Sequence, residues 1–221
     1  GISSAGLVVI NLSVSMGLAV LLKRSVFGIG FFRTAIFTPY ITSLVIWSIL
    51  WKFIFANELG LMNQMLGLFG IKGIPWLYNT KTAMPIVILV SALKNVGLNM
   101  IIFLSAMKNV PEMYYEAALI DGANKWNSFR SITLPLITPT IFMTFILTFI
   151  GSLKVFGQIL IMTGGGPGTS TYVLVFYIFQ KAFKQYEFGY ASSIAFILFS
   201  ITLVFTFIQW GLRKRWVYNE E

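Results

Sequence analysis

Long apolar runs alternate with shorter polar intervals along the chain, and five of these runs are long enough to cross a lipid bilayer. A spanning helix needs about 20 apolar residues, because each residue advances it by about 1.5 Å through a core about 30 Å thick. The runs predict helices over Ile2–Leu22, Phe31–Phe55, Met84–Met107, Ile141–Met162 and Ala191–Leu212. We therefore predict an all-α integral membrane protein, a polytopic helical bundle in which residues 1–221 form one transmembrane domain.

Basic residues are distributed unevenly between the loops on the two sides of this bundle. One set of loops holds Lys23, Arg24, Arg33, Lys108, Lys125, Arg130, Arg213, Lys214 and Arg215, whereas the other holds only Lys72, Lys81, Lys181 and Lys184. Because Lys and Arg accumulate in cytoplasmic loops, we expect residues 108–139 and the C-terminus in the cytoplasm. Gly1, Ala56–Ala83 and Thr163–Tyr190 are then outside, with a short amphipathic helix around Leu61–Phe69. An odd number of spans with Gly1 outside also predicts a further span ahead of it.

Composition narrows the possible chemistry. Of the 221 residues, 57% are hydrophobic and 10% are charged, and the chain has neither cysteine nor histidine. This composition excludes disulfides, thiol catalysis, imidazole metal ligation and Ser-His catalysis, and we expect no metal and no cofactor. The net charge of +9 does not indicate nucleic-acid binding, because the basic residues are scattered at loop ends instead of forming one patch.

The long polar interval 108–139 predicts two short helices joined by a glycine turn. Pro111 favours a helix start, because its missing N–H costs nothing in the first turn, and Gly122 is expected to end this helix. A second helix is expected from about Asn124 to Ile132. It should stop, and the chain should turn toward the next span, at the two prolines that follow, Pro135 and Pro139.

Small residues beside carboxylates recur in this loop, at Glu116-Ala117-Ala118 and at Asp121-Gly122-Ala123. They leave a face that another protein can approach closely, although such a loop can also fold back on its own bundle. With Phe129, Ile132, Leu134-Pro135 and Pro139, the run resembles the EAA loop of permease subunits of binding-protein-dependent ATP-binding-cassette importers. The resemblance implies the type I importer permease fold and a coupling helix seated in a cleft of the cytoplasmic ATPase. It implies an ATPase contact at Glu116, Ala117, Ala118, Asp121, Gly122, Ala123, Leu134 and Pro135.

Glycines gather around Pro167 in the external segment. They allow positive φ and a tight re-entry into the bundle, with a plain surface turn as the alternative. The run Thr163–Pro167, followed by Ser170-Thr171 and by Tyr186-Glu187-Gly189-Ala191, is similar to the carbohydrate branch of these permeases. Within that branch of maltose, glycerol-phosphate and multiple-sugar permeases, it is most similar to the larger maltose-permease subunit. The resemblance implies an outer gate, facing the binding protein, at Gly164, Gly165, Gly166 and Pro167.

Polar side chains inside the predicted spans are costly in lipid, so we expect them to face a cavity or another helix. The third span carries Ser91, Asn95 and Asn99 at every fourth position, with Lys94 beside them. The fourth span carries, at helical spacing, Thr144, Thr148, Gly151, Lys154 and Gln158. The second span has polar and aromatic groups just after Pro39, where a kink is expected, at Tyr40, Ser43 and Trp47.

Such side chains can simply hold helices together. Lys154 is different, because a lysine deep in a span without an acidic partner needs water, amide oxygens or the hydroxyls of a ligand. We therefore predict a cavity-lining substrate pathway formed by Tyr40, Ser43, Ser91, Asn95, Asn99, Gly151, Lys154 and Gln158.

These features predict half of a translocation pathway for a sugar or oligosaccharide. The chain lacks a GxxxxGK[ST] phosphate-binding loop, so we expect a transport subunit and not an enzyme. The resemblance implies a bacterial or archaeal cell membrane and, as partners, a second homologous permease subunit, an ATPase dimer, an extracytoplasmic solute-binding protein, sugar and lipid. A glycerol phosphate is the alternative solute. A proton- or sodium-coupled carrier is disfavoured, because all seven carboxylates lie in loops or at chain ends.

Overall fold

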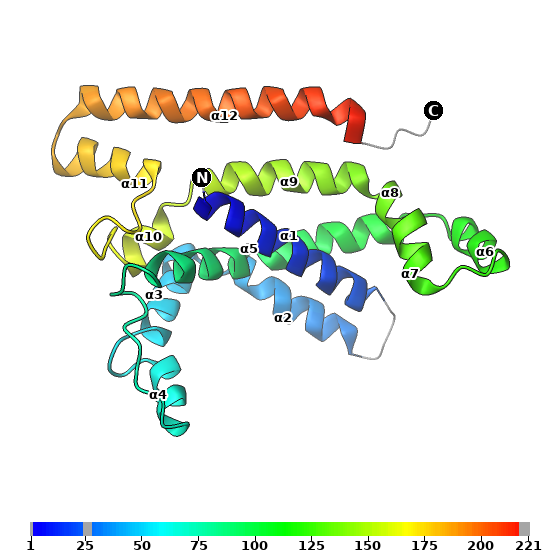
Figure 1. Ribbon diagram of the computed structural model, residues 1–221, viewed down its shortest axis with the longest axis horizontal. Helices are drawn as coiled ribbons and strands as arrows, with labels where there is room; N and C mark the ends of the chain where they lie inside the picture. The colour runs from blue at the N-terminus through cyan, green and yellow to red at the C-terminus, as the bar shows by residue number, and fades with distance from the viewer. Residues whose placement is uncertain (1, 24–27, 217–221) are drawn as a thin grey trace.

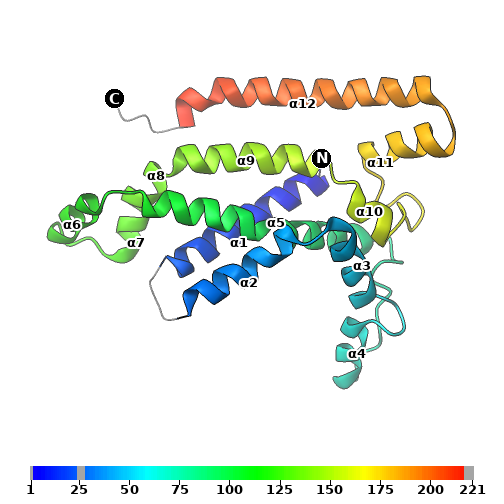
Figure 2. The same cartoon turned by 180° about the vertical axis from the view of Figure 1, so that it is seen from behind.

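The computed structural model describes residues 2–23 and 28–216, and the regular elements in these ranges are all helical. The longest helices run lengthwise through the molecule (Figure 1): α1 (Ile2–Leu22), α5 (Ala83–Lys108), α9 (Thr138–Leu153) and α12 (Phe188–Trp216). At one end lie α6 (Glu112–Ile120) and α7 (Lys125–Ser128), as Figure 2 shows from behind. The positions predicted for Gly1, Arg24 and the C-terminal residues 217–221 lie outside the described residues.

Three helices in the described ranges are individually long and apolar enough to cross a membrane, over Ser4–Leu22, Ala83–Lys108 and Phe188–Gln209. They confirm the predicted first, third and fifth spans as helices. Two further candidates are bent pairs, namely α2 (Ile29–Ile41) with α3 (Leu44–Ile54), and Lys125–Leu136 with α9. The described residues therefore offer up to five spans, if each bent pair counts as one.

The second predicted span, Phe31–Phe55, is wrong as a continuous helix. α2 and α3 meet at a bend of 100°, and Pro39, where the kink was expected, lies inside α2. The break falls instead at Thr42 and Ser43, whose ψ angles of 141° and 136° are extended. Carbonyl groups freed at such a break are tolerated in a membrane only where other groups take their hydrogen bonds, and here Lys94 does so.

The fourth predicted span, Ile141–Met162, is also interrupted. Residues Lys154–Phe156 separate α9 from α10 (Gly157–Met162), so Lys154 caps the end of α9 instead of lying in the middle of a span. Within the break, Phe156 packs against the buried ring of Phe176, at 6.3 Å between ring centroids. The single helical face predicted for the polar residues of this span is therefore divided between two helices.

The interval Ala56–Ala83 contains α4 (Leu61–Leu68), which confirms the predicted short helix. Asn63 on α4 ties the interval together, because its side-chain nitrogen donates to the carbonyl oxygens of Asn57 and Ile74 at 2.7 and 2.9 Å. Its side-chain oxygen accepts from the indole N–H of Trp76 at 2.8 Å. One buried amide thus closes most of the loop.

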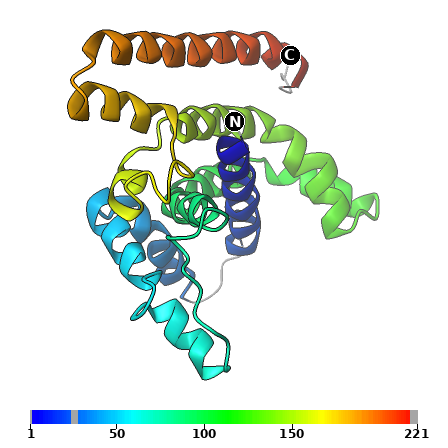
Figure 3. The ribbon, with the colours of Figure 1, turned by 60° about the vertical axis from the view of Figure 1, so that its left-hand side comes forward.

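The segment Thr163–Tyr190 is not a loop throughout, since it contains α11 (Leu174–Phe179) and the π-helical turn η2 (Gln180–Lys184). Figure 3 shows α11 beside the start of α12. Lys181 on η2 pairs with Glu187 at 3.0 Å, and this hydrogen bond raises the pKa of Lys181. It is the only ion pair among the side chains that the structure describes.

Polar contacts and a close backbone approach hold α5 against its neighbours. From α1, Asn11 donates to the Ala92 carbonyl at 2.9 Å and Ser15 donates to the Val96 carbonyl at 3.1 Å, and both side chains are fully buried. A Cβ atom on Gly97 would collide with the Ile36 carbonyl oxygen of α2. Small residues and buried hydroxyls or amides of this kind are the usual means by which helices associate in lipid.

Candidate functional site

A cavity of about 320 Å³ lies among α5, α9 and α10. This volume is at the lower end of the range of about 300–1,000 Å³ typical of small-molecule sites. Six of the eight residues predicted for the substrate pathway line it: Ser91, Asn95, Asn99, Gly151, Lys154 and Gln158. The structure therefore brings together the polar stripes of the third and fourth predicted spans, even though the fourth is broken.

The polar groups of the cavity differ in how they are bonded. Asn99 donates to Asn11 and, at 3.0 Å, to the Thr148 hydroxyl, so its amide links three helices. Asn95 donates to the Ser91 carbonyl at 3.1 Å within α5. By contrast, the Ser91 hydroxyl is buried and has no hydrogen-bond partner among the described residues. A buried hydroxyl without a partner costs free energy, which a bound polar ligand would recover.

Lys154 lies at the rim of the cavity, in the break between α9 and α10, and its side chain is exposed. It forms no ion pair within residues 2–23 and 28–216. Lys154 thus lies among the residues that line the cavity, at the C-terminal end of α9. Its ammonium group offers three donors to a solute entering the cavity.

Tyr40 and Ser43 do not join the other pathway residues. Tyr40 is 39% exposed and packs on Phe37, with 5.5 Å between the ring centroids. Ser43 lies at the break that separates α2 from α3, and the next residue, Leu44, lines the cavity in its place. The 100° bend separates them from the cavity, because residues on its two sides no longer share a helix face.

Lys94 is the residue near the cavity whose role the sequence did not reveal. Its ammonium nitrogen lies 2.9 Å from the Pro39 carbonyl oxygen, 3.3 Å from that of Tyr40 and 2.6 Å from that of Thr42. Carbonyl groups at a helix C-terminus carry partial negative charge and lack partners within the helix. Lys94 therefore caps α2 at its break. The sequence hinted at this role only by placing a lysine beside the polar stripe of the third span.

The loop 108–139 has the predicted helix-turn-helix form. α6 ends in a Schellman motif, in which Ala123 N–H donates to the Ala118 carbonyl at 2.8 Å and Gly122 N–H donates to that of Leu119 at 3.1 Å. Gly122 has φ +74°, a left-handed conformation that favours glycine. Asn124 then caps α7, accepting from the backbone N–H of Asn127 at 2.9 Å.

The second helix of this loop extends further than predicted. After α7 it continues through the π-helical turn η1 (Phe129–Thr133) and α8 (Leu134–Leu136), and it bends at Ile137 before α9. The bend thus falls between the two prolines: Pro135 lies in α8, directly after the π-helical turn, and Pro139 lies in the first turn of α9, where its missing N–H is not needed.

The outer surface of this loop is apolar as well as small. Glu116, Ala117, Asp121 and Gly122 are exposed, Ala118, Ala123 and Pro135 are partly buried, and Leu134 is 37% exposed. Large apolar side chains that the sequence analysis did not single out are exposed around them: Met113 (66%), Leu119 (76%), Ile120 (88%) and Trp126 (66%). Exposed apolar groups clustered in this way are typical of a protein interaction site.

The glycine-rich segment after α10 packs inward. Gly164, Gly165 and Gly168 have φ angles of +60°, +91° and +58°, whereas Gly166 and Pro167 are joined by a cis peptide bond. The fully buried Thr171 hydroxyl fixes the turn, because it contacts the Thr163 hydroxyl at 2.8 Å and donates to the Gly166 carbonyl at 3.0 Å.

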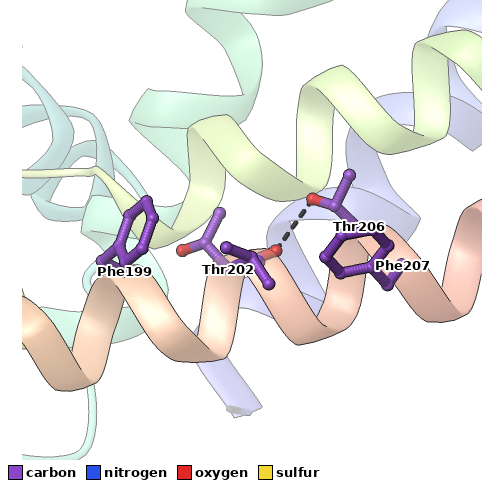
Figure 4. A pocket seen from close by; sticks show the side chains of 5 residues that line it. Phe199, Thr202, Thr206 and Phe207 are labelled. Atoms are coloured by element: carbon purple, nitrogen blue, oxygen red, sulfur yellow. Dashed lines mark hydrogen bonds between the residues drawn. The ribbon is translucent and has the colours of Figure 1, made fainter.

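A further hollow of about 310 Å³ opens on α12 beside α9 (Figure 4). Its lining is almost entirely apolar, formed by Phe199, Thr202, Leu203, Thr206 and Phe207. The Thr206 hydroxyl donates to the Thr202 carbonyl at 2.8 Å, so it is satisfied within the helix (Figure 4). This hollow offers few groups for a polar solute. The described residues also contain no group of three carboxylates that could hold a metal ion.

Comparisons with known proteins agree with this arrangement. Residues 11–218 match the family described as the binding-protein-dependent transport system inner membrane component. The chain is 37% identical over 181 residues to the probable ABC transporter permease protein YurN of Bacillus subtilis, covering 81% of this chain and 62% of that protein. It is 36% identical to the lactose transport system permease protein LacF of Rhizobium radiobacter, covering 84% and 64%.

The fold is also found among solved structures. The chain superimposes with a TM-score of 0.87 on a chain of the bacterial alginate ABC transporter, crystallised in complex with an alginate pentasaccharide-bound periplasmic protein. The two are 23% identical, and the match covers 96% of this chain and 76% of the other. At this identity the likeness shows the fold, which is that of a permease chain in an ABC transporter.

Proposed function

Because the chain belongs to the family of inner membrane components of binding-protein-dependent transport systems, we propose that it is the permease subunit of an ATP-driven importer for a sugar or oligosaccharide. The chain forms half of the translocation pathway and catalyses no reaction itself. The observation that carries this proposal is the combination of a polar cavity between the helices with an exposed apolar loop at one end of them.

The coupling role falls to the loop 108–139. An ATPase seats on α6 and the turn after it, at Glu116, Ala117, Ala118, Asp121, Gly122 and Ala123, with Leu134 and Pro135 at the base. The exposed side chains of Leu119 and Ile120 support this proposal, since they give a partner apolar area to bury. The fixed Schellman turn keeps the surface in one shape before docking, which lowers the entropic cost of association.

The substrate pathway runs through the cavity lined by Ser91, Asn95, Asn99, Gly151, Lys154 and Gln158. Its hydroxyl, amide and ammonium groups match the hydroxyls of a sugar, each of which both donates and accepts hydrogen bonds. The sugar assignment is supported by LacF, which carries lactose in its name, and by the alginate transporter. Tyr40 and Ser43, which lie near the break between α2 and α3, remain proposed pathway residues.

The glycine-rich turn at Gly164, Gly165, Gly166 and Pro167 is the proposed outer gate. A Cβ atom on Gly165 would lie 2.5 Å from the ring of Phe176 and 2.7 Å from the ring of Tyr172, so the turn packs closely against both rings. A movement of this turn would therefore displace α11, which contains Phe176. The binding protein docks on this side and delivers the sugar.

The proposed assembly contains a second homologous permease subunit, an ATPase dimer and an extracytoplasmic solute-binding protein, in a bacterial or archaeal cell membrane. The chain crosses this membrane several times, with the loop 108–139 and the C-terminus in the cytoplasm. ATP binding closes the ATPase dimer, the loop passes this closure to the helices, and the cavity is exposed alternately to the two sides. The permease supplies shape and hydrogen bonds, and the ATPase supplies the free energy.

Solute-stimulated ATP hydrolysis by the reconstituted assembly tests this proposal. The panel contains lactose, maltose, an arabino-oligosaccharide and glycerol 3-phosphate, and each is tested with native protein, with Lys154→Ala and with Lys52→Ala as an exposed control outside the cavity. We expect stimulation by one of the sugars, weakened by Lys154→Ala alone. Stimulation by glycerol 3-phosphate and no sugar would overturn the sugar assignment, and stimulation by no solute would overturn the importer proposal for this panel.

A further inference from the structure

α6 is attached to the rest of the protein mainly through one side chain. None of its residues is fully buried, and only Tyr115 and Ala118 are partly covered, whereas the other side chains of the helix are exposed. Tyr115 packs against the apolar cluster that contains Phe103, Met107 and Ile137. Beside it lies a hollow of about 560 Å³, so α6 does not rest along its length on the bundle.

The hydroxyl of Tyr115 joins two elements that are far apart in the sequence. The Lys23 ammonium group, one residue beyond the end of α1, donates to it at 3.1 Å and lies 4.3 Å from the centroid of the same ring. On its other side the Tyr115 oxygen lies 2.8 Å from the Thr133 hydroxyl in η1. Since Lys23 only donates, the tyrosine hydroxyl accepts from Lys23 and is free to donate its own hydrogen to Thr133.

Thr133 and Lys23, the two partners of the Tyr115 hydroxyl, lie where a displacement of α6 would reach other helices. Thr133 is 3% exposed and lies in the π-helical turn that leads through α8 into α9, the helix that contributes Gly151 to the cavity. Lys23 lies at the end of α1, whose C-terminal carbonyl at Leu22 is bonded by Arg33 at 2.7 Å. The chain Lys23–Tyr115–Thr133 therefore connects α6 with α9 and with α1, which contributes Leu7 to the lining of the cavity.

We propose that Tyr115 is a positioning residue that clamps α6 to α1 and η1, so that a displacement of α6 reaches both helices together. This inference rests on the proposed function, because the ATPase would supply the displacement. Without the tyrosine hydroxyl, α6 would tilt over the adjacent hollow while the ATPase stays bound. The ATPase would then hydrolyse ATP with less sugar moved.

The test is the ratio of sugar imported to ATP hydrolysed by the complete transporter. Tyr115→Phe keeps the ring under Lys23 but removes both hydrogen bonds, and we expect the ratio to fall by about threefold to tenfold, as for the loss of ordinary hydrogen bonds. Tyr114→Phe is the matched control, because Tyr114 is exposed and its hydroxyl forms no bond among the described residues. Thr133→Val should resemble Tyr115→Phe. An unchanged ratio in Tyr115→Phe would overturn the clamp.

A second measurement does not depend on sugar or ATPase. The chain has no cysteine, so spin labels placed at Leu21→Cys and Glu112→Cys report the distance between α1 and α6 in the full-length permease in lipid. We expect one narrow distance distribution for the native loop and a broad one for Tyr115→Phe. Equal distributions would refute the clamp. A broad distribution for Tyr115→Phe, combined with no binding of an ATPase to the native protein, would support the clamp and contradict the proposed function.

Discussion

The Lys94 ammonium nitrogen lies 2.6 Å from the carbonyl oxygen of Thr42, at the point where α2 gives way to α3. This contact replaces the helical hydrogen bonds that the chain loses at a bend of 100°. A lysine that is 8% exposed next to lipid would be costly without partners, and a broken helix would be costly without a donor. The ammonium group and the carbonyl groups therefore satisfy each other, two residues before Leu44, which lines the cavity.

Lys94→Met should therefore destabilise the permease. The variant keeps the volume of the side chain but leaves carbonyl groups without donors, which costs about 1–3 kcal/mol. For a chain of this size each kcal/mol lowers the melting temperature by about 2–4 °C. Thermal unfolding in detergent measures the effect against Lys52→Met, an exposed lysine on α3. Equal melting of the two variants would show that the cap is not needed.

Gly97→Ala should loosen the crossing of α2 and α5. The added methyl group would collide with the Ile36 carbonyl oxygen, and backbone atoms cannot move aside as the end of a side chain can. Overpacking of this kind costs about 1–3 kcal/mol. Gly17→Ala on α1 is the control, because no atom lies within 4 Å of its added carbon. The same unfolding assay should show a loss for Gly97→Ala only, and a stable Gly97→Ala protein would contradict the predicted close approach.

Gly122→Trp should leave the permease pair in the membrane but detach or uncouple the ATPase. The glycine has φ +74°, which costs other residues about 1–2 kcal/mol, and the bulky ring would stand on the proposed docking surface. Gly122→Ala separates the two effects, since it adds backbone strain with little bulk. Co-purification of the ATPase with each variant measures docking. Normal co-purification and transport by Gly122→Trp would sink the docking assignment.

Ser91→Ala should weaken the response to the solute without lowering the stability of the protein. The hydroxyl has no hydrogen-bond partner among the described residues, so its removal should leave the melting temperature unchanged or slightly higher. If a sugar hydroxyl bonds to it, the sugar concentration for half-maximal ATPase stimulation should rise by about tenfold. Ser200→Ala on the exposed side of α12 is the control. A lower melting temperature with unchanged stimulation would make Ser91 a structural residue.

Much of the fold follows from hydropathy, because residues buried in lipid must be apolar over a fixed length. The limits predicted for the first span coincide with α1, and the third and fifth differ by a few residues from α5 and α12. The two broken spans could not be predicted in this way. Hydropathy averages over a run and does not detect a break such as Lys154–Phe156, which depends on contacts with a distant aromatic cluster.

In the candidate site, too, residues grouped by spacing along one helix could be predicted, whereas contacts between helices could not. Spacing along one helix placed Ser91, Asn95 and Asn99 together, and the cavity contains all three. Spacing alone does not reveal that Tyr40 and Ser43 lie outside this cavity, because the bend after α2 and its hydrogen bonds to Lys94 of α5 are long-range features. Tyr115 was not noticed for a similar reason, since its two partners lie 92 and 18 positions away in the sequence.

Uptake of labelled sugar into vesicles tests the importer proposal most directly. The assembled transporter is reconstituted with ATP enclosed on the side of the loop 108–139, and with binding protein and the sugar selected by the ATPase panel on the other side. We expect accumulation that requires both ATP and binding protein and is weakened by Lys154→Ala. Uptake that needs neither ATP nor binding protein, or that follows a proton or sodium gradient, would contradict the proposal. It would indicate an ion-coupled secondary carrier instead.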